Sequence, residues 1–135
     1  MAIGDGLTAL VIDDDESIRT LIVKVVSAHG FKANFAADGL EALMRLEEHT
    51  PDIIICDSMM PNLDGISFLK AIKQRASTTN IPVVFVTAKT DLESIRETMR
   101  AGAFFYLAKP FKRDELVSKI KESLAAVDIA TINAV

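Results

Sequence analysis

The feature that most constrains the fold of this chain is a regular alternation of short apolar runs with segments of helical periodicity. Three runs, at 7–12, 52–56 and 82–86, are rich in Val, Ile and Leu and show no polar alternation. Continuous apolar runs of this length are typical of strands in a parallel sheet that is covered on both faces. Two weaker runs, at 32–36 and 104–108, are interpreted as further strands.

Helix signals fill the intervals between these runs. The first helix is predicted over 16–29, and Gly30 follows it as a stop signal. Asp38, with Glu41 three residues later, resembles a capping box at the start of the second helix. The other helix starts are an Asp64 cap for the third, an Asp91 cap for the fourth, and a fifth helix over 113–126.

Apolar residues at helical spacing mark the side of each helix that we expect to face the core. In chain order they are Ile18, Leu21, Ile22, Val25 and Val26; Leu40, Leu43 and Leu46; Phe68, Leu69 and Ile72; Leu92, Ile95 and Met99; and Val117, Ile120 and Leu124.

The strand–helix alternation repeats five times, which predicts an α/β domain with a parallel sheet and right-handed crossover connections. A length of 135 residues suits one domain, and the 50% hydrophobic content is enough for a sizeable core. We assign residues 1–127 to this domain and expect 128–135 to form a short, loosely held C-terminal tail.

Composition excludes several classes of protein. A net charge of −4 gives no sign of a nucleic-acid-binding surface. The single cysteine, Cys56, cannot form an internal disulfide and fits a reducing compartment. No apolar run approaches the roughly 18–20 residues of a membrane span, and the first residues do not resemble a signal peptide. We therefore expect a cytoplasmic protein that binds neither nucleic acid nor membrane.

Reactive side chains follow four of the predicted strands, at the edge where ligands bind in open α/β sheets. They are Asp13, Asp14 and Asp15 after the first strand, Asp57 after the third, Thr87 after the fourth and Lys109 after the fifth. Carboxylate oxygens without His or Cys ligands favour Mg²⁺ over zinc. The lysine and the hydroxyl suit phosphoryl oxygens, and a carboxylate can attack phosphorus. The pattern indicates Mg²⁺-dependent phosphoryl transfer onto an aspartate.

The acidic run at 13–16 has a second interpretation. Acidic side chains also stabilise a helix N-terminus through the helix dipole. Asp15 and Glu16 are assigned to this capping role. Asp13 and Asp14 are assigned to a metal site, because reactive side chains at three other strand ends point to the same edge of the sheet.

Four segments together resemble the receiver domain of two-component response regulators: LVIDDDESIR, IIICDSMMPNLDG, VVFVTAK and GAFFYLAKPF. The resemblance covers roughly residues 7–126. It implies a flavodoxin-like (βα)5 fold, doubly wound around a five-stranded parallel sheet with strand order 2-1-3-4-5.

The resemblance also implies a role for each matching residue. Asp57 matches the aspartate that accepts a phosphoryl group from the phosphohistidine of a histidine kinase. Asp57, Asp14 and the main-chain carbonyl of Met59 would bind Mg²⁺ directly, and Asp13 matches the carboxylate that helps hold the ion through water. Thr87 and Lys109 match residues that contact the phosphoryl group, and Tyr106 matches an aromatic whose rotamer accompanies activation. The Lys109–Pro110 bond is cis in the family.

The function that we predict is that of a stand-alone receiver. It would catalyse its own phosphorylation and dephosphorylation without being a conventional enzyme. Phosphorylation would alter the face made by the fourth helix, the fifth strand and the fifth helix, and so select a partner. That partner is either a downstream target protein or a histidine phosphotransfer protein to which the phosphoryl group is relayed. We expect a monomer or a weak, phosphorylation-dependent dimer, and the chain is alternatively a receiver excised from a longer protein.

Two pairs of neighbours receive separate predictions. In the family, the positions of Met59 and Lys89 influence how fast the aspartyl phosphate hydrolyses. An apolar Met59 would not orient an attacking water, so we predict a phosphorylated state that lasts minutes or longer. Phe104 and Phe105 precede Tyr106 where receivers commonly carry polar residues. One of them is either an exposed contact surface or packed against the flanking helices.

Two rival functions remain at this stage. The stretch DDDES loosely fits the D-x-D-x-[ST] pattern of haloacid-dehalogenase-like phosphatases, in which Asp13 would be the nucleophile. A flavin-binding module would share the fold class, but it would want a Ser-, Thr- or Gly-rich phosphate loop after the first strand. The acidic residues there disfavour it.

Overall fold

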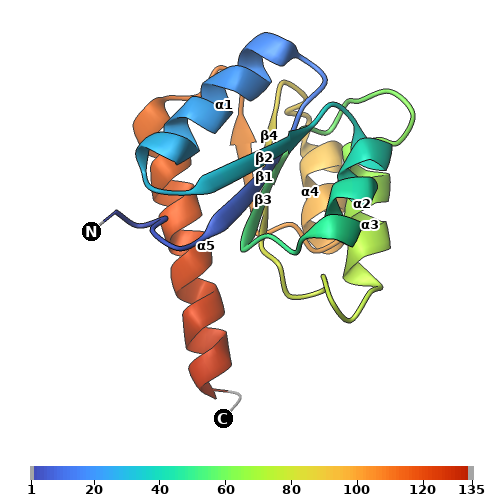
Figure 1. The fold of residues 1–135 in the computed structure, drawn as a ribbon. Helices are drawn as coiled ribbons and strands as arrows, with labels where there is room; N and C mark the ends of the chain where they lie inside the picture. Colours follow the sequence, from blue (N-terminus) through green and yellow to red (C-terminus); the bar gives the residue numbers. More distant parts are fainter. Residues whose placement is uncertain (1, 134–135) are drawn as a thin grey trace.

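The computed structural model describes residues 2–133, with side chains described for residues 2–127, and folds this part into alternating strands and helices (Figure 1). In chain order the elements are β1 (Thr8–Ile12), α1 (Glu16–Ala28), β2 (Lys32–Ala36), α2 (Gly39–Glu48), β3 (Ile53–Cys56), α3 (Gly65–Lys73), β4 (Val83–Thr87), α4 (Leu92–Arg100), β5 (Phe105–Ala108) and α5 (Arg113–Asn133). The strands form one parallel sheet in the order β2-β1-β3-β4-β5. The predicted fold class and strand order are confirmed.

Helices cover both faces of the sheet. Figure 1 shows α1 and α5 on one face and α2, α3 and α4 on the other. Side chains alternate along each central strand, so that Ile54 and Phe85 pack toward α2 and α3 while Ile55 and Val84 pack toward α1 and α5. All four are at most 1% exposed. Burying an aliphatic or aromatic side chain stabilises the fold by about 1.5–3 kcal/mol, and burial on both faces explains why these strands are continuously apolar.

The aspartates predicted to cap helices do so. The Asp38 carboxylate accepts a 2.8 Å hydrogen bond from the Glu41 amide at the start of α2. Asp64 and Asp91 accept the corresponding bonds in α3 and α4. The α2 motif differs in one respect from the expected box, because the Glu41 side chain accepts a bond from the Ala37 amide and not from that of Asp38.

The expected inner faces of three helices are partly wrong. Leu21 and Leu40 are 48% and 50% exposed, although each lies at helical spacing with buried neighbours. In α4 the difference is larger, since Leu92 is 60% exposed and the buried side chains are Ser94 and Thr98. Both of these hydroxyls donate locally, Ser94 to the Asp91 carboxylate and Thr98 to the Ser94 carbonyl. Satisfied small polar residues can therefore face the sheet, while Leu92 and Met99 are exposed and Ile95 is half-buried.

The fifth helix begins where it was predicted but is longer. It continues to Asn133 instead of ending near residue 126, so 128–133 are helical and not irregular, and 134–135 lie outside the described residues. No Gly or Pro follows Pro110, so nothing in the sequence stops the helix. Figure 1 shows the last turns of α5 extending past the body of the domain. The division into a domain over 1–127 and a tail stays a prediction.

The aromatic residues before Tyr106 are half-buried. The rings of Phe104 and Phe105 meet edge to face with their centroids 4.9 Å apart, and the Lys119 ammonium lies 4.5 Å from the Phe105 centroid. Phe105 also packs against the core cluster on the α1 and α5 side of the sheet. Neither phenylalanine is exposed, so the packing alternative describes this pair.

Among the described residues, no helix is long and apolar enough to cross a bilayer. The peptide bond between Lys109 and Pro110 is cis, as the resemblance implied.

A pair of leucine truncations tests the assignment of inner and outer helix faces. Leu69 is 0% exposed and Leu40 is 50% exposed, and both lie within helices. Leu69→Ala is expected to lower the free energy of unfolding by about 2–5 kcal/mol because it leaves a cavity. Leu40→Ala is expected to change it by less than about 0.5 kcal/mol. Urea unfolding followed by circular dichroism measures both, and equal losses would contradict the assignment.

Candidate functional site

Three strand ends place the candidate residues at one edge of the sheet. The pairing pattern continues one residue past β1, β3 and β5. The Asp13 amide donates to the Ala36 carbonyl, the Asp57 amide to that of Ile12, and the Lys109 amide to that of Thr87. These backbone bonds fix the Cα positions of the three residues, because each residue is hydrogen-bonded to the neighbouring strand of the sheet.

The three carboxylates predicted to bind metal lie together. One oxygen from each of Asp13, Asp14 and Asp57 lies within 4.8 Å of the other two. Asp13 is 1% exposed and Asp57 is 7% exposed, whereas Asp14 is open to solvent. The sequence-based expectation that these residues meet at one edge is met.

The Lys109 ammonium lies between the two buried carboxylates. Its Nζ atom is 2.8 Å from Asp13 Oδ2 and 3.3 Å from Asp57 Oδ2. Two carboxylates about 4 Å apart repel by on the order of 4 kcal/mol at an effective dielectric constant near 20. The shared ammonium offsets that repulsion and holds the two acids in place.

Burial and charge act in opposite directions on these groups. Burial raises the pKa of Asp13, and this effect outweighs its hydrogen bonds to Lys109 and to the Asp15 amide. Burial alone would lower the pKa of Lys109, but the hydrogen bond to Asp13 and the attraction of Asp57 outweigh it, so the pKa is raised. The lysine therefore stays charged at neutral pH.

Asp13 is held from several sides. Its Oδ1 accepts a 2.9 Å bond from the Asp15 amide, and its carbonyl accepts a 3.0 Å bond from the Arg19 guanidinium. The Asp15 carboxylate accepts bonds from the amides of Ser17 and Ile18 at the start of α1. Asp15 therefore caps the helix, as predicted, and its carboxylate is occupied there.

The backbone after β3 closes tightly around Asp57. The Ser58 amide donates a 2.7 Å bond to Asp57 Oδ1, and the Gly65 amide donates a 3.0 Å bond to the Ser58 carbonyl. A Cβ atom at Gly65 would lie 2.2 Å from the Asp57 carbonyl oxygen, so only glycine allows α3 to start this close to the site.

The residues predicted to sense the phosphoryl group are linked through one loop. Thr87 is 1% exposed, and its Oγ1 accepts a 3.1 Å bond from the Lys89 amide. The Tyr106 hydroxyl donates to the Lys89 carbonyl, and its ring stacks on Phe85 with the centroids 6.3 Å apart. Lys89 thus connects Thr87 to Tyr106 through its main chain.

A cleft of about 450 Å³ opens beside this cluster. Its lining residues come from the loops after β1, β3 and β4 and from the first turns of α3 and α4: Asp14, Ser58, Met59, Met60, Asp64, Ile66, Lys89 and Ser94. Met59 is 58% exposed.

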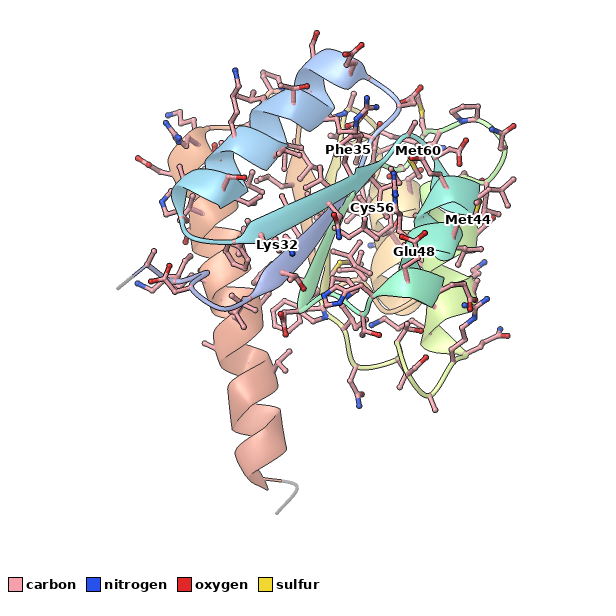
Figure 2. All side chains as sticks on the ribbon, viewed as in Figure 1. Lys32, Phe35, Met44, Glu48, Cys56 and Met60 are labelled. Atoms are coloured by element: carbon pink, nitrogen blue, oxygen red, sulfur yellow. The ribbon has the colours of Figure 1, made fainter. Side chains whose placement is uncertain are left out.

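Cys56, shown inside the fold in Figure 2, is buried, and burial raises the pKa of its thiol well above the ordinary value.

Sequence reasoning missed one residue in this region. Ser58 is 8% exposed, and its hydroxyl oxygen has no hydrogen-bond partner among the described residues. Leaving a buried hydroxyl unpaired costs about 1–3 kcal/mol. A serine next to Asp57 carries no signal of this in the sequence, because the missing partner appears only in three dimensions.

The residues present fit a magnesium ion. Carboxylate oxygens are hard ligands, and one of the three acids is open to solvent, which suits an ion that keeps several waters. The positive charge of Lys109, which contacts both Asp13 and Asp57, compensates one of the negative charges of the cluster. No His or Cys side chain joins the cluster within the described residues.

Comparison with known proteins gives one consistent family. A family profile described as the response regulator receiver domain matches residues 9–121. The DNA-binding transcriptional regulator NtrC of Escherichia coli K12 is 37% identical over 115 residues, which are 85% of this chain and 24% of NtrC. The DNA-binding response regulator MtrA of Mycobacterium tuberculosis is 34% identical over 119 residues, 88% of this chain and 51% of MtrA.

Solved structures agree with these sequences. The chemotaxis protein CheY4 of Vibrio cholerae superposes with a TM-score of 0.83 at 31% identity, over 87% of this chain and 98% of that one. The chain spans about a quarter of the length of NtrC and about half of MtrA, so the activities of those whole proteins do not transfer with the match.

Removing the lysine tests the charge balance at this edge. Lys109→Met is expected to lower the free energy of unfolding at neutral pH by on the order of 3 kcal/mol, because it leaves buried carboxylates unpaired. The pKa of Asp13 already lies above its unfolded value, so its ionised form weakens folding above the folded pKa. That penalty disappears as the pH falls below the ordinary value near 4. The loss should therefore shrink on acidification.

Lys70→Met is the matched control, because Lys70 is 58% exposed and its ion pair with Glu97 is 3.9 Å long. This change is expected to cost at most about 1 kcal/mol. Thermal and urea unfolding of both variants across a pH series provide the measurement. Equal losses in the two variants would show that Lys109 balances no buried charge.

Proposed function

Since this chain belongs to the response regulator receiver domain family of two-component systems, we propose that Asp57 accepts a phosphoryl group from a histidine kinase in a Mg²⁺-dependent reaction. The observation that carries this proposal is the convergence of three carboxylates within 4.8 Å beside the Lys109 ammonium. Asp57 is 7% exposed, and the two residues that follow it, Ser58 and Met59, line the adjoining cleft.

The chain's own residues account for the transfer. A carboxylate oxygen of Asp57 forms a bond to phosphorus while the bond from phosphorus to the donor's imidazole nitrogen breaks. The electron pair of that bond stays on the nitrogen, and the donor, protonated beforehand on its other ring nitrogen, leaves as neutral imidazole. Lys109, 3.3 Å from Asp57 Oδ2, is placed to contact a phosphoryl oxygen. Asp13, Asp14, Asp57 and the Met59 carbonyl would hold Mg²⁺, which when bound neutralises charge on the phosphoryl oxygens.

The linked loop after β4 supplies a route for switching. A phosphoryl group adds charge and acceptor oxygens, and the buried Thr87 hydroxyl would turn toward them. That movement breaks its bond from the Lys89 amide and so disturbs the loop whose carbonyl anchors Tyr106. The α4, β5 and α5 face would then change its population of packings. Leu92 and Met99, 60% and 40% exposed on α4, give this face apolar contact area.

The partners follow from the same proposal. A histidine kinase supplies the phosphoryl group. The switched face binds a downstream target protein, or the phosphoryl group passes on to a histidine phosphotransfer protein. We propose a cytoplasmic regulator whose receiver is monomeric or forms a weak dimer when phosphorylated, and which binds neither nucleic acid nor membrane.

The phosphatase rival is disfavoured by the arrangement around Asp13. Asp13 is less exposed than Asp57, and its Oδ2 makes the shorter contact to Lys109, 2.8 Å against 3.3 Å for Asp57 Oδ2. Asp15, the second aspartate of the D-x-D pattern, caps α1 through its own carboxylate. The two aspartates of that pattern are therefore not arranged around one reacting phosphorus.

Substitution of the aspartates tests the phosphorylation site. The protein incubated with phosphoramidate and MgCl₂ is expected to gain one phosphoryl group, detected by intact mass and mapped by peptide analysis. Asp57→Asn should abolish labelling, because it removes the nucleophile. Asp13→Asn should slow labelling roughly tenfold or more through weaker metal binding and leave the label on residue 57.

Asp15→Asn is the control for this series, since asparagine caps a helix about as well as aspartate, and its labelling should match that of the parent protein. A label on Asp13 that persists in Asp57→Asn would establish the phosphatase-like alternative.

Met59 is proposed to set the lifetime of the phosphorylated state. Its apolar side chain lines the cleft and offers no hydrogen bond to an attacking water, so the label should last minutes or longer in buffer with Mg²⁺ and no phosphatase. Met59→Asn is expected to shorten this lifetime several-fold. Met44→Asn, at a 68% exposed position on α2 (Figure 2), should leave it unchanged. Loss of the label within seconds from the parent protein would refute the proposal.

A further inference from the structure

Ser58 stands out among the residues of the cleft beside Asp57. It is the one described residue with a buried side-chain oxygen that lacks a hydrogen-bond partner. Buried hydroxyls are nearly always paired with protein or with ordered water, so an unpaired one needs an explanation. The proposed chemistry has not used this group.

The position of Ser58 ties it to the metal ligands. It lies between Asp57 and Met59 in the chain, and its amide already holds Asp57 Oδ1 at 2.7 Å. It lines the same cleft as Asp14, the solvent-exposed acid of the cluster. Three of the four expected ligands are thus either its chain neighbours or its neighbours across the cleft.

A water ligand of a bound Mg²⁺ ion could be the missing hydrogen-bond partner of the Ser58 hydroxyl. Mg²⁺ keeps several of its six oxygen ligands as water when protein carboxylates supply only some of them. Those waters carry hydrogen atoms and accept bonds weakly, so buried protein groups orient them. The Ser58 side chain has one rotatable heavy-atom bond, and rotation about χ1 between staggered positions turns its hydroxyl toward the cleft at small cost.

We propose that Ser58 is a positioning residue of the metal site, whose hydroxyl hydrogen-bonds to a water ligand of the Mg²⁺ ion held by Asp13, Asp14 and Asp57. This inference rests on the proposed function and deepens it. Ser58 pairs its hydroxyl only when the ion is present, so part of the binding free energy of the ion comes from satisfying that hydroxyl. The metal-free protein gains nothing from it.

Ser94 provides a matched comparison within the same cleft. It is also 8% exposed and also lines the cleft, but its hydroxyl donates a 2.8 Å bond to the Asp91 carboxylate at the start of α4. Its partner is therefore already in the protein. Truncating the two serines removes the same atom from the same cleft and separates the two roles.

The experiment measures the Mg²⁺ affinity and the metal-free stability of the full chain. Thermal unfolding is followed by circular dichroism over a MgCl₂ series, and the rise in Tm with concentration gives Kd. Ser58→Ala is expected to raise Kd about tenfold and to leave the metal-free Tm unchanged or higher. Ser94→Ala is expected to keep Kd within about twofold of the parent and to lower the metal-free Tm, because it weakens a helix cap.

The conservative variant Ser58→Thr keeps the hydroxyl and is expected to restore most of the Mg²⁺ affinity. Ser58→Ala with the Kd of the parent protein would overturn the inference and leave the proposed function standing. A lower metal-free Tm in Ser58→Ala with unchanged Kd would likewise overturn it, by assigning the hydroxyl a purely structural bond. A parent protein whose Tm does not respond to MgCl₂ would overturn the proposed metal site itself.

Discussion

The ammonium of Lys109 lies between the buried carboxylates of Asp13 and Asp57, and the rest of the site depends on this contact. Without a positive charge, two acids at this separation and depth would repel each other or take up protons. The Lys109 ammonium offsets that repulsion and holds the two carboxylates close to one position. Under the proposed function, a phosphoryl oxygen on Asp57 would compete for the same ammonium that holds the two acids together.

The sheet holds the backbone of the residues in this contact. Asp13, Asp57 and Lys109 each follow a strand whose backbone pairing continues one residue past its end. The loop after β4 is not part of the strand pairing, and under the proposed function a change in charge at this edge would act on it. Lys89 lies in that loop and bonds through its amide to Thr87 and through its carbonyl to Tyr106. In the proposed switch, this loop would connect the charge at Asp57 to the face made by α4, β5 and α5.

Much of the fold and of the site was predictable because local sequence patterns determine them. Continuous apolar runs gave the strands, and the aspartate caps gave the helix starts. The acidic and basic residues at strand ends indicated the site, since parallel strands end at a common edge. The inner face of α4 was not predictable, because Ser94 and Thr98 are buried only by satisfying their hydroxyls within the helix. The unpaired hydroxyl of Ser58 was equally hidden, since it depends on the neighbours that the fold places around it.

The central claim is that these carboxylates bind a magnesium ion at the position where Asp57 accepts phosphorus. A crystal structure of the full chain grown in saturating MgCl₂ tests it most directly. The account predicts an octahedral ion with oxygen ligands at roughly 2.0–2.1 Å, among them Asp14, Asp57 and the Met59 carbonyl. A structure that shows no ion there, with the Lys109 ammonium bonded to both Asp13 and Asp57, would contradict it.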